Sequence, residues 1–158
     1  MVPVFEFLKL AEALLAAEVD YALCGGLAVA VHGYPRNTRD IDILVREADL
    51  PAVRTVVGSV GFSILGGPQN FNEGQFDEMR LFRLNKVLDT ELLTLDMILV
   101  TPVLQDVWDS RVWMDIRGLK LCVVSKEGIK KMKRLAGRTQ DLADIEALDS
   151  IQSDEETK

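Results

Sequence analysis

The sequence predicts a single α/β or α+β domain with a small mixed sheet flanked by helices. Helical and extended segments alternate in the order helix, strand, helix, strand, helix, strands, helices, which favours one sheet covered by helices. The 158 residues suffice for one domain with its own core. With 48% hydrophobic and 27% charged residues, the composition is that of a globular chain. We expect the domain to span residues 1–152 and residues 153–158 to form a polar, disordered tail.

Helix and strand alternate in the first third of the chain. The expected elements are, in order, a helix over 4–19, a strand over 21–24, a helix over 27–32, a strand over 40–45 and a helix over 50–60. Gly25-Gly26 joins the first strand to a helix of small residues, which Gly33 and Pro35 end. Asp49 is expected to cap the next helix, with Pro51 in its first turn.

The rest of the chain begins with an expected loop. Residues 66–74 hold three glycines, one proline and two asparagines, which is typical of a mobile loop. The elements expected after it are strands over 79–85 and 93–100, a short helix over 102–109, a hairpin of 112–116 and 119–124, a helix over 126–135 capped by Ser125, and a last helix over 140–151.

The composition argues against several classes of protein. A net charge of −7 disfavours a module that binds nucleic-acid duplexes, because such modules carry a basic excess. A single histidine and no CxxC motif leave no ligand set for zinc. Cys24 and Cys122 lie in apolar runs and are expected to be reduced core thiols of a cytoplasmic protein. No apolar run approaches the roughly 20 residues of a membrane span, and no basic secretory leader precedes the first helix.

Two carboxylates stand together at the start of the strand over 40–45. Asp40 and Asp42 are two residues apart and therefore point to the same face, while Ile41 and Ile43 enter the core. Carboxylates this close stay ionised together only beside a positive charge. A hard cation such as Mg²⁺ (or Mn²⁺) is the natural partner, because it binds one or two carboxylates together with substrate phosphates.

A third carboxylate, Asp96, lies in the middle of an apolar strand. A carboxylate there is costly unless it is paired or metal-bound. If this strand lies beside that of Asp40, the three carboxylates converge, which suits a site with two metal ions about 3.5–4 Å apart. The sequence thus predicts Asp40, Asp42 and Asp96 as metal-binding and catalytic residues.

Gly25-Gly26 marks a second candidate site, at the junction of a strand and a helix. Glycine lets the backbone approach a ligand closely, and the first N–H groups of a helix favour a phosphate. By itself the pair is a weak signal and is more typical of an ordinary turn.

The combination of the two features resembles a known signature. The run Leu23-Cys24-Gly25-Gly26, followed after thirteen residues by Asp40-Ile41-Asp42-Ile43, is similar to that of the DNA-polymerase-β-like nucleotidyltransferase superfamily. The segment over 26–40 resembles its bacterial branch of stand-alone transferases and abortive-infection toxins. Late in the chain, the order of Lys133, Arg138, Asp141 and Asp144 is similar to a pattern of the same branch.

The resemblance implies a function. A nucleoside triphosphate would bind with its phosphates on Gly25-Gly26, Asp40 and Asp42 would hold Mg²⁺, and Asp96 would complete the metal set and help to activate an acceptor hydroxyl. Attack on the α-phosphate would release pyrophosphate. The acceptor could be an RNA end, a protein hydroxyl or a small molecule, and a homodimer or partner chain could complete the site. The branch also implies the toxin of a toxin–antitoxin pair.

Several polar residues have both a binding and a structural interpretation. Arg36, Thr38 and Arg39 could contact phosphates or could balance the nearby aspartates. Six cations between residues 126 and 138 are typical of a solvated helix face, but Lys133 borders the apolar stripe and is expected to reach inward to the nucleotide. Asp141 and Asp144 share one helix face and could pair with Arg138 or place the nucleotide.

Two other functions use the same residues. The first is a binding module, in which the fold is kept as a nucleotide sensor or partner subunit without turnover. The second is a metal-dependent phosphohydrolase, which would release inorganic phosphate. Such hydrolases commonly add histidines, and His32 is the only one in this chain.

Overall fold

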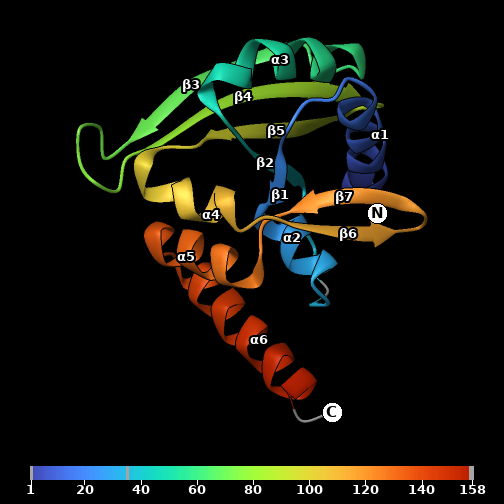
Figure 1. Cartoon of the computed structure of the whole chain (residues 1–158). Helices are drawn as coiled ribbons and strands as arrows, with labels where there is room; N and C mark the ends of the chain where they lie inside the picture. Colours follow the sequence, from blue (N-terminus) through green and yellow to red (C-terminus); the bar gives the residue numbers. More distant parts are fainter. Residues whose placement is uncertain (1, 35, 157–158) are drawn as a thin grey trace.

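The protein is built on one seven-stranded mixed sheet with helices on both faces (Figure 1). The computed structural model describes residues 2–34 and 36–156, without the side chains of 139, 140 and 151–156. The strand order is β3-β4-β5-β2-β1-β7-β6. The strands are β1 Ala22–Cys24, β2 Asp40–Val45, β3 Ile64–Phe71, β4 Met79–Leu88, β5 Glu91–Leu99, β6 Val112–Ile116 and β7 Leu119–Val123.

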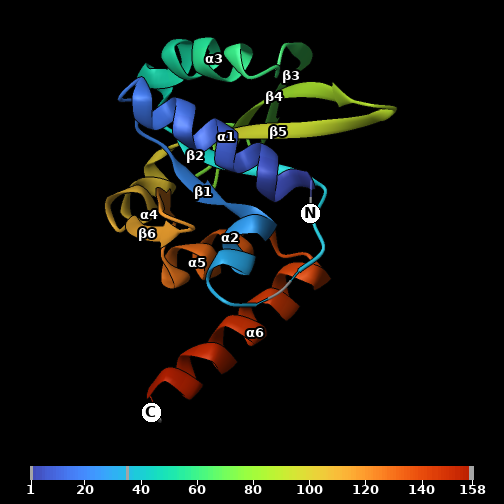
Figure 2. The same ribbon diagram turned by 90° about the vertical axis from the view of Figure 1, so that its right-hand side faces the viewer.

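The helices separate into two layers. Their bounds are α1 Val2–Ala16, α2 Gly25–Val31, α3 Leu50–Ser59, α4 Gln105–Asp109, α5 Lys126–Ala136 and α6 Thr139–Glu156, with short 3₁₀ turns at Glu47–Asp49 and Pro102–Leu104. Figures 1 and 2 show α1 and α3 on one side of the sheet and α4, α5 and α6 on the other, with α6 extending away from the body of the molecule. No helix among the described residues has the length and apolar character that a membrane span requires.

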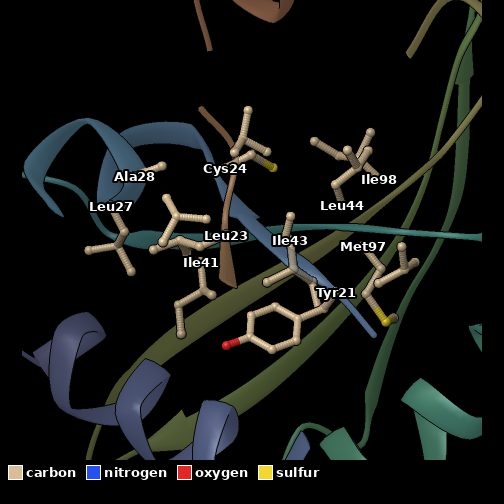
Figure 3. Close-up of a cluster of buried hydrophobic side chains, with 14 of the residues drawn as sticks. Tyr21, Leu23, Cys24, Leu27, Ala28, Ile41, Ile43, Leu44, Met97 and Ile98 are labelled. Atoms are coloured by element: carbon tan, nitrogen blue, oxygen red, sulfur yellow. The ribbon is translucent and has the colours of Figure 1, made fainter. Parts of the chain in front are cut away.

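The centre of the sheet is apolar on both faces. Residues of one strand alternate between the faces, and β2 and β5 each contain a run of consecutive buried residues, so both of their faces are covered (Figure 3). Ile43 and Met97 point to the side of α1 and α3, whereas Leu44 and Ile98 point to the side of α5. This alternation also fixes the direction of the carboxylates, because Asp42 and Asp96 share the face of Leu44 and Ile98.

Most of the expected elements are present, including the strand over 40–45, the hairpin and both later helices. The Ser125 hydroxyl accepts a hydrogen bond from the Gly128 amide, as expected of a cap. Asp49 does not cap α3, because its carboxylate accepts a hydrogen bond from Arg46 instead. Pro35, expected to end the second helix, lies outside the described residues.

The prediction of a loop over residues 66–74 is wrong for residues 66–71, whereas residues 72–74 do lie in the turn between β3 and β4. Residues 64–71 form β3, which pairs with β4 in antiparallel fashion with a register shift between Leu65 and Gly67. Because β3 is the edge strand, the missing N–H of Pro68 and the bulge at the glycines are tolerated there. At the other end of the chain, α6 is helical through Glu156, within the expected tail, and residues 157–158 lie outside the described part.

Candidate active site

The first glycine of the Gly-Gly pair packs directly against the Asp42 carboxylate. β1 and β2 are antiparallel, and Cys24 is the ladder partner of Asp42. Gly25 follows Cys24 with a φ of +67°, in the left-handed region that favours glycine. A Cβ built on Gly25 would lie 2.1 Å from Asp42 Oδ2. The fold therefore brings together the two halves of the motif seen in the sequence.

We expect Gly25→Ala to be strongly destabilising and to abolish any activity that depends on Asp42. The new methyl group would displace the Asp42 carboxylate, and the positive φ would add backbone strain. The matched control is Gly58→Ala in α3, where a Cβ meets nothing within 4 Å and alanine favours the helix by about 1 kcal/mol. Thermal denaturation should show a lower Tm for the first variant and an unchanged or higher Tm for the second. Equal Tm values would contradict the geometry of Gly25.

The second glycine is in contact with the loop that precedes β2. A Cβ on Gly26 would lie 3.1 Å from the Thr38 side chain and 3.3 Å from Arg36 Nη1. Arg36 also donates a hydrogen bond of 2.8 Å to Asp144 of α6. Arg39, by contrast, is exposed and lines, together with Thr38, a hollow beside the start of α1 and of β5. The structure thus places Arg36 and Thr38, but not Arg39, beside the Gly-Gly pair.

Asp42 and Asp96 face each other across the parallel strands β2 and β5. They are direct ladder partners, and Asp40 is the partner of Thr94 at the start of β2. The expected adjacency of the two strands is therefore confirmed. Asp40 is exposed, Asp42 is partly buried and Asp96 is buried. Burial, together with the negative charges of Asp96 and Asp40, raises the pKa of Asp42 to about 7. The carboxylates repel one another enough that a cation beside them would be favourable.

Asp96 is engaged by an arginine of the next strand. Arg83 Nε donates to Asp96 Oδ1 over 2.7 Å, and Arg83 Nη2 donates to Oδ2 over 2.9 Å. Arg83 of β4 and Asp96 of β5 are direct partners in the antiparallel ladder. This hydrogen-bonded pair raises the pKa of Arg83. A carboxylate in the middle of an apolar strand thus receives the partner that it requires.

Lys133 points inward, as its place beside the apolar stripe predicts. Its ammonium forms ion pairs with Asp141 and Asp144, whose side chains are fully buried. Burial alone would raise the pKa of Asp141, but hydrogen bonds from Arg138 and Lys133 outweigh it and lower that pKa. Arg36 also forms an ion pair with Asp144. Three cations therefore surround two carboxylates, which leaves a net positive charge near Asp42.

A small hollow of about 110 Å³ lies between the sheet and α5. Its walls include Gly25, Asp42, Lys133, Arg138 and Met79. Cys24 also lines it, and burial raises the pKa of the Cys24 thiol well above its usual value, so the thiol stays protonated. The hollow joins the Gly-Gly junction, the Asp42 carboxylate and the cations of α5 in one place.

The carboxylates of Asp40 and Asp42 are chemically suited to bind a hard divalent cation. Asp40 and Asp42 provide oxygen ligands on one face, and burial together with the charges of Asp96 and Asp40 raises the pKa of Asp42. As the side chains stand, the described residues contain no group of three His, Cys, Asp or Glu that could hold a metal ion. The carboxylates of Asp40 and Asp42 could bind a metal ion together with oxygens of a bound phosphate. The role of Asp96 as a metal ligand stays a prediction.

The sequence did not indicate Arg83. It is one of four cations in the chain between residues 80 and 120 that lie in strands, and no motif distinguishes it. Its alternation with Leu81 and Asn85 would have placed it on one face of a strand. Only the register of β4 against β5 shows that its partner is Asp96.

No protein-family model matches the sequence, and no curated protein matches it. Several solved structures share its fold. TM1012 from Thermotoga maritima, a suspected nucleotidyltransferase, is 17% identical with a TM-score of 0.60, over 88% of this chain and 87% of that one. ANT(2'')-Ia in complex with adenylyl-2''-tobramycin is 15% identical with a TM-score of 0.58, over 97% of this chain and 96% of that one. JHP933 from Helicobacter pylori is 17% identical with a TM-score of 0.52, over 90% of this chain and 63% of that one. The chain therefore has a nucleotidyltransferase-like fold, in which a mixed sheet is flanked by helices.

Proposed function

We propose that the protein is a Mg²⁺-dependent nucleotidyltransferase that moves a nucleoside monophosphate from a triphosphate such as ATP to an acceptor hydroxyl. One observation carries the proposal: Gly25 packs against the Asp42 carboxylate, with Asp96 directly opposite on the neighbouring strand. A binding module with the same fold needs no such convergence of carboxylates. The fold shared with solved nucleotidyltransferases is consistent with it.

The triphosphate is proposed to bind at the Gly-Gly junction. A ligand could approach the backbone closely at this junction, because neither glycine carries a Cβ. Arg36, Lys133 and Arg138 supply positive charge beside it, and Arg36 and Thr38 lie where a Cβ on Gly26 would contact them closely. Arginine suits phosphate because its guanidinium donates two parallel hydrogen bonds. Arg39 is exposed on the same loop and is proposed to contact the acceptor end or the phosphates from solvent.

Asp40 and Asp42 are proposed to hold Mg²⁺ (or Mn²⁺) together with the phosphates. When bound, the cation neutralises charge that develops on the phosphates during transfer. In the reaction, the acceptor oxygen forms a bond to the α-phosphorus, the bond to the β-phosphate oxygen breaks, and pyrophosphate leaves with the electron pair. The protein's own part is to position the reactants and to stabilise the charge, which is where most catalysis of phosphoryl transfer arises.

The acceptor is proposed to be a small molecule with a hydroxyl group. ANT(2'')-Ia was solved with adenylyl-2''-tobramycin, and this chain spans 96% of that one. A chain of this size can therefore hold both a nucleotide and a small acceptor without an added domain. A polymer acceptor is the alternative, and it would fit the toxin role that the sequence resemblance implies.

The test is transfer of label from α-labelled nucleoside triphosphates into a cell extract, with Mg²⁺ present. The control is the Asp40→Asn/Asp42→Asn protein. Products are then separated by nuclease digestion, protease digestion and small-molecule extraction. Label in the small-molecule fraction, only with the unaltered protein, supports the proposal.

Label sensitive to nuclease or protease would support transfer to RNA or protein, and growth arrest on expression would then favour the toxin role. Nucleotide binding without any label transfer would favour the binding module. Release of inorganic phosphate in place of pyrophosphate would indicate a phosphohydrolase. Equal transfer by the double variant would contradict the assignment of Asp40 and Asp42.

A further inference from the structure

Arg83 and Asp96 form a pair that the fold itself fixes. Both oxygens of Asp96 accept a hydrogen bond from the same guanidinium, at 2.7 and 2.9 Å. The two residues are opposite each other in the β4–β5 ladder, so the backbone sets their approach. A bidentate pair of this kind is the strongest arrangement available to arginine and a carboxylate.

Strand β3 supports this position of Arg83. A Cβ built on Gly66 would lie 2.5 Å from Arg83 Cγ and 2.9 Å from Arg83 Cβ. The stem of Arg83 therefore occupies the space that a side chain at residue 66 would need. The register shift between Leu65 and Gly67 lies at the same place. Packing against the β3 backbone limits the movement of the Arg83 side chain away from Asp96.

Asp40 and Asp42 are held differently. Within the described part of the chain, no hydrogen bond or ion pair engages either carboxylate. They lie beside the Gly-Gly junction, whereas Asp96 lies on the side of β4. Met79, Leu81 and Arg83 alternate along β4 on the face of Asp96, and each is partly exposed. The partly exposed residues on the face of Asp96 thus lie along β4, on the opposite side from the Gly-Gly junction where the triphosphate is proposed to bind.

We propose that Arg83 is a positioning residue that reserves Asp96 for the acceptor, so that Asp40 and Asp42 alone hold the cation with the triphosphate. The inference rests on the proposed function and divides its carboxylates into two roles. Each oxygen of Asp96 keeps a second lone pair beside its bond to Arg83, and one of these lone pairs accepts the hydrogen bond of the acceptor hydroxyl. As the acceptor oxygen bonds to the α-phosphorus and pyrophosphate leaves with its electron pair, the hydroxyl proton passes to that Asp96 oxygen and then to water.

The first experiment measures binding without turnover. Mn²⁺ binding in the presence of α,β-methylene-ATP is followed by electron paramagnetic resonance for the unaltered protein and for Asp42→Asn, Asp96→Asn and Arg83→Gln. We expect Asp42→Asn to weaken Mn²⁺ binding at least tenfold, which is the scale for loss of a ligand or its support. Asp96→Asn and Arg83→Gln should stay within about threefold of the unaltered protein, because in this assignment neither touches the cation.

The second experiment separates positioning from folding. Arg83→Gln should lower kcat about 10- to 100-fold with the nucleotide KM unchanged, and Arg83→Lys should recover only part of the rate, since lysine restores the charge without the bidentate fork. The matched control is Arg80→Gln, which removes a bidentate pair with Glu47 on the same strand. It should leave both kcat and Mn²⁺ binding unchanged.

The outcomes separate this inference from the proposed function. If Asp96→Asn weakens Mn²⁺ binding as much as Asp42→Asn, Asp96 is a metal ligand and the assignment of Arg83 is overturned. The same holds if Arg83→Gln transfers at the normal rate. Absence of Mn²⁺–analogue binding by the unaltered protein would overturn the proposed function, and this assignment with it. Asp96→Asn keeps the binding test decisive where Arg83→Gln does not fold.

Discussion

Replacing Asp42 by asparagine is expected to abolish nucleotidyl transfer and, at the same time, to stabilise the free protein at neutral and alkaline pH. Burial and the charges of Asp96 and Asp40 raise the pKa of Asp42 to about 7. The ionised side chain is thus disfavoured in the folded state. Asparagine has nearly the same shape and removes the charge, so it relieves this cost while it removes a proposed metal ligand.

The pH dependence follows from the direction of the shift. An unfolded aspartate loses its proton near pH 4, whereas folded Asp42 keeps it up to about pH 7. Between these values the folded state binds the extra proton, so the free energy of unfolding falls as the pH rises. The free energy of unfolding of Asp42→Asn should therefore exceed that of the unaltered protein by an amount that grows from about pH 4 to pH 7 and then levels off at roughly 1–3 kcal/mol.

Urea denaturation at a series of pH values, without divalent cations, checks this expectation. Asp40→Asn is the matched control, because Asp40 is exposed and its replacement should change stability by less than about 0.5 kcal/mol while it still lowers transfer. A stability difference for Asp42→Asn that is constant across the pH range would contradict the raised pKa. Full activity of that variant would contradict the proposed mechanism.

The same shift links cation binding to pH. A cation binds the ionised form of Asp42, so folded protein must release a proton on binding whenever the pH is below about 7. Affinity for Mn²⁺ should therefore increase between pH 6 and pH 8 by up to about tenfold, since each pKa unit corresponds to that factor. The Asp42→Asn protein should show no such increase from this group.

The sequence was sufficient for the parts of the fold that depend on local pattern. The strand over 40–45 alternates aspartate with isoleucine, and both its bounds and the shared face of its carboxylates are as predicted. Lys133 was expected to turn inward because it borders the apolar stripe of its helix, and its side chain is buried. Ser125 caps that helix as expected. In each case the deciding interaction lies within a few residues of the pattern.

What could not be predicted depends on pairing between distant segments. Strand β3 contains two glycines and a proline, so its own residues favour a loop, and only the ladder with β4 makes it a strand. The pairing of Arg83 with Asp96 needs the register of β4 and β5. Arg36 and Asp144 are 108 residues apart in the chain, and no local pattern joins them. Long-range contacts of this kind are set by the tertiary fold.

Replacing Asp144 by alanine is expected to be the most destabilising change at the C-terminal helices. Its side chain is fully buried and forms ion pairs with Arg36 and Lys133. The variant leaves Lys133, itself only 9% exposed in its side chain, with Asp141 as its carboxylate partner among the described residues. Removing one partner of a buried ion pair costs about 3–5 kcal/mol when the other charge is left uncompensated, and because Lys133 keeps Asp141 we expect a loss toward the lower end of that range.

A surface pair provides the matched control. Glu47 forms a bidentate pair with Arg80, but its side chain is 62% exposed, so Glu47→Ala should cost less than about 1 kcal/mol. Asp144→Asn keeps the shape of the side chain and loses its charge. Its loss of stability should fall between the losses for Asp144→Ala and Glu47→Ala. Urea denaturation of the three variants at pH 7 tests this order, and equal losses for Asp144→Ala and Glu47→Ala would contradict it.

The same ion pairs should also make the fold sensitive to acid. Because hydrogen bonds from Arg138 and Lys133 lower the pKa of Asp141, that carboxylate stabilises the folded protein above its unfolded pKa, near 4. This stability is lost as the pH falls through the lower pKa of the folded state. The unaltered protein should therefore lose more stability between pH 5 and pH 3 than Asp141→Asn does. Since Arg36 contacts both Asp144 and the Gly-Gly junction, acid that loosens these pairs should also weaken nucleotide binding before the sheet itself unfolds.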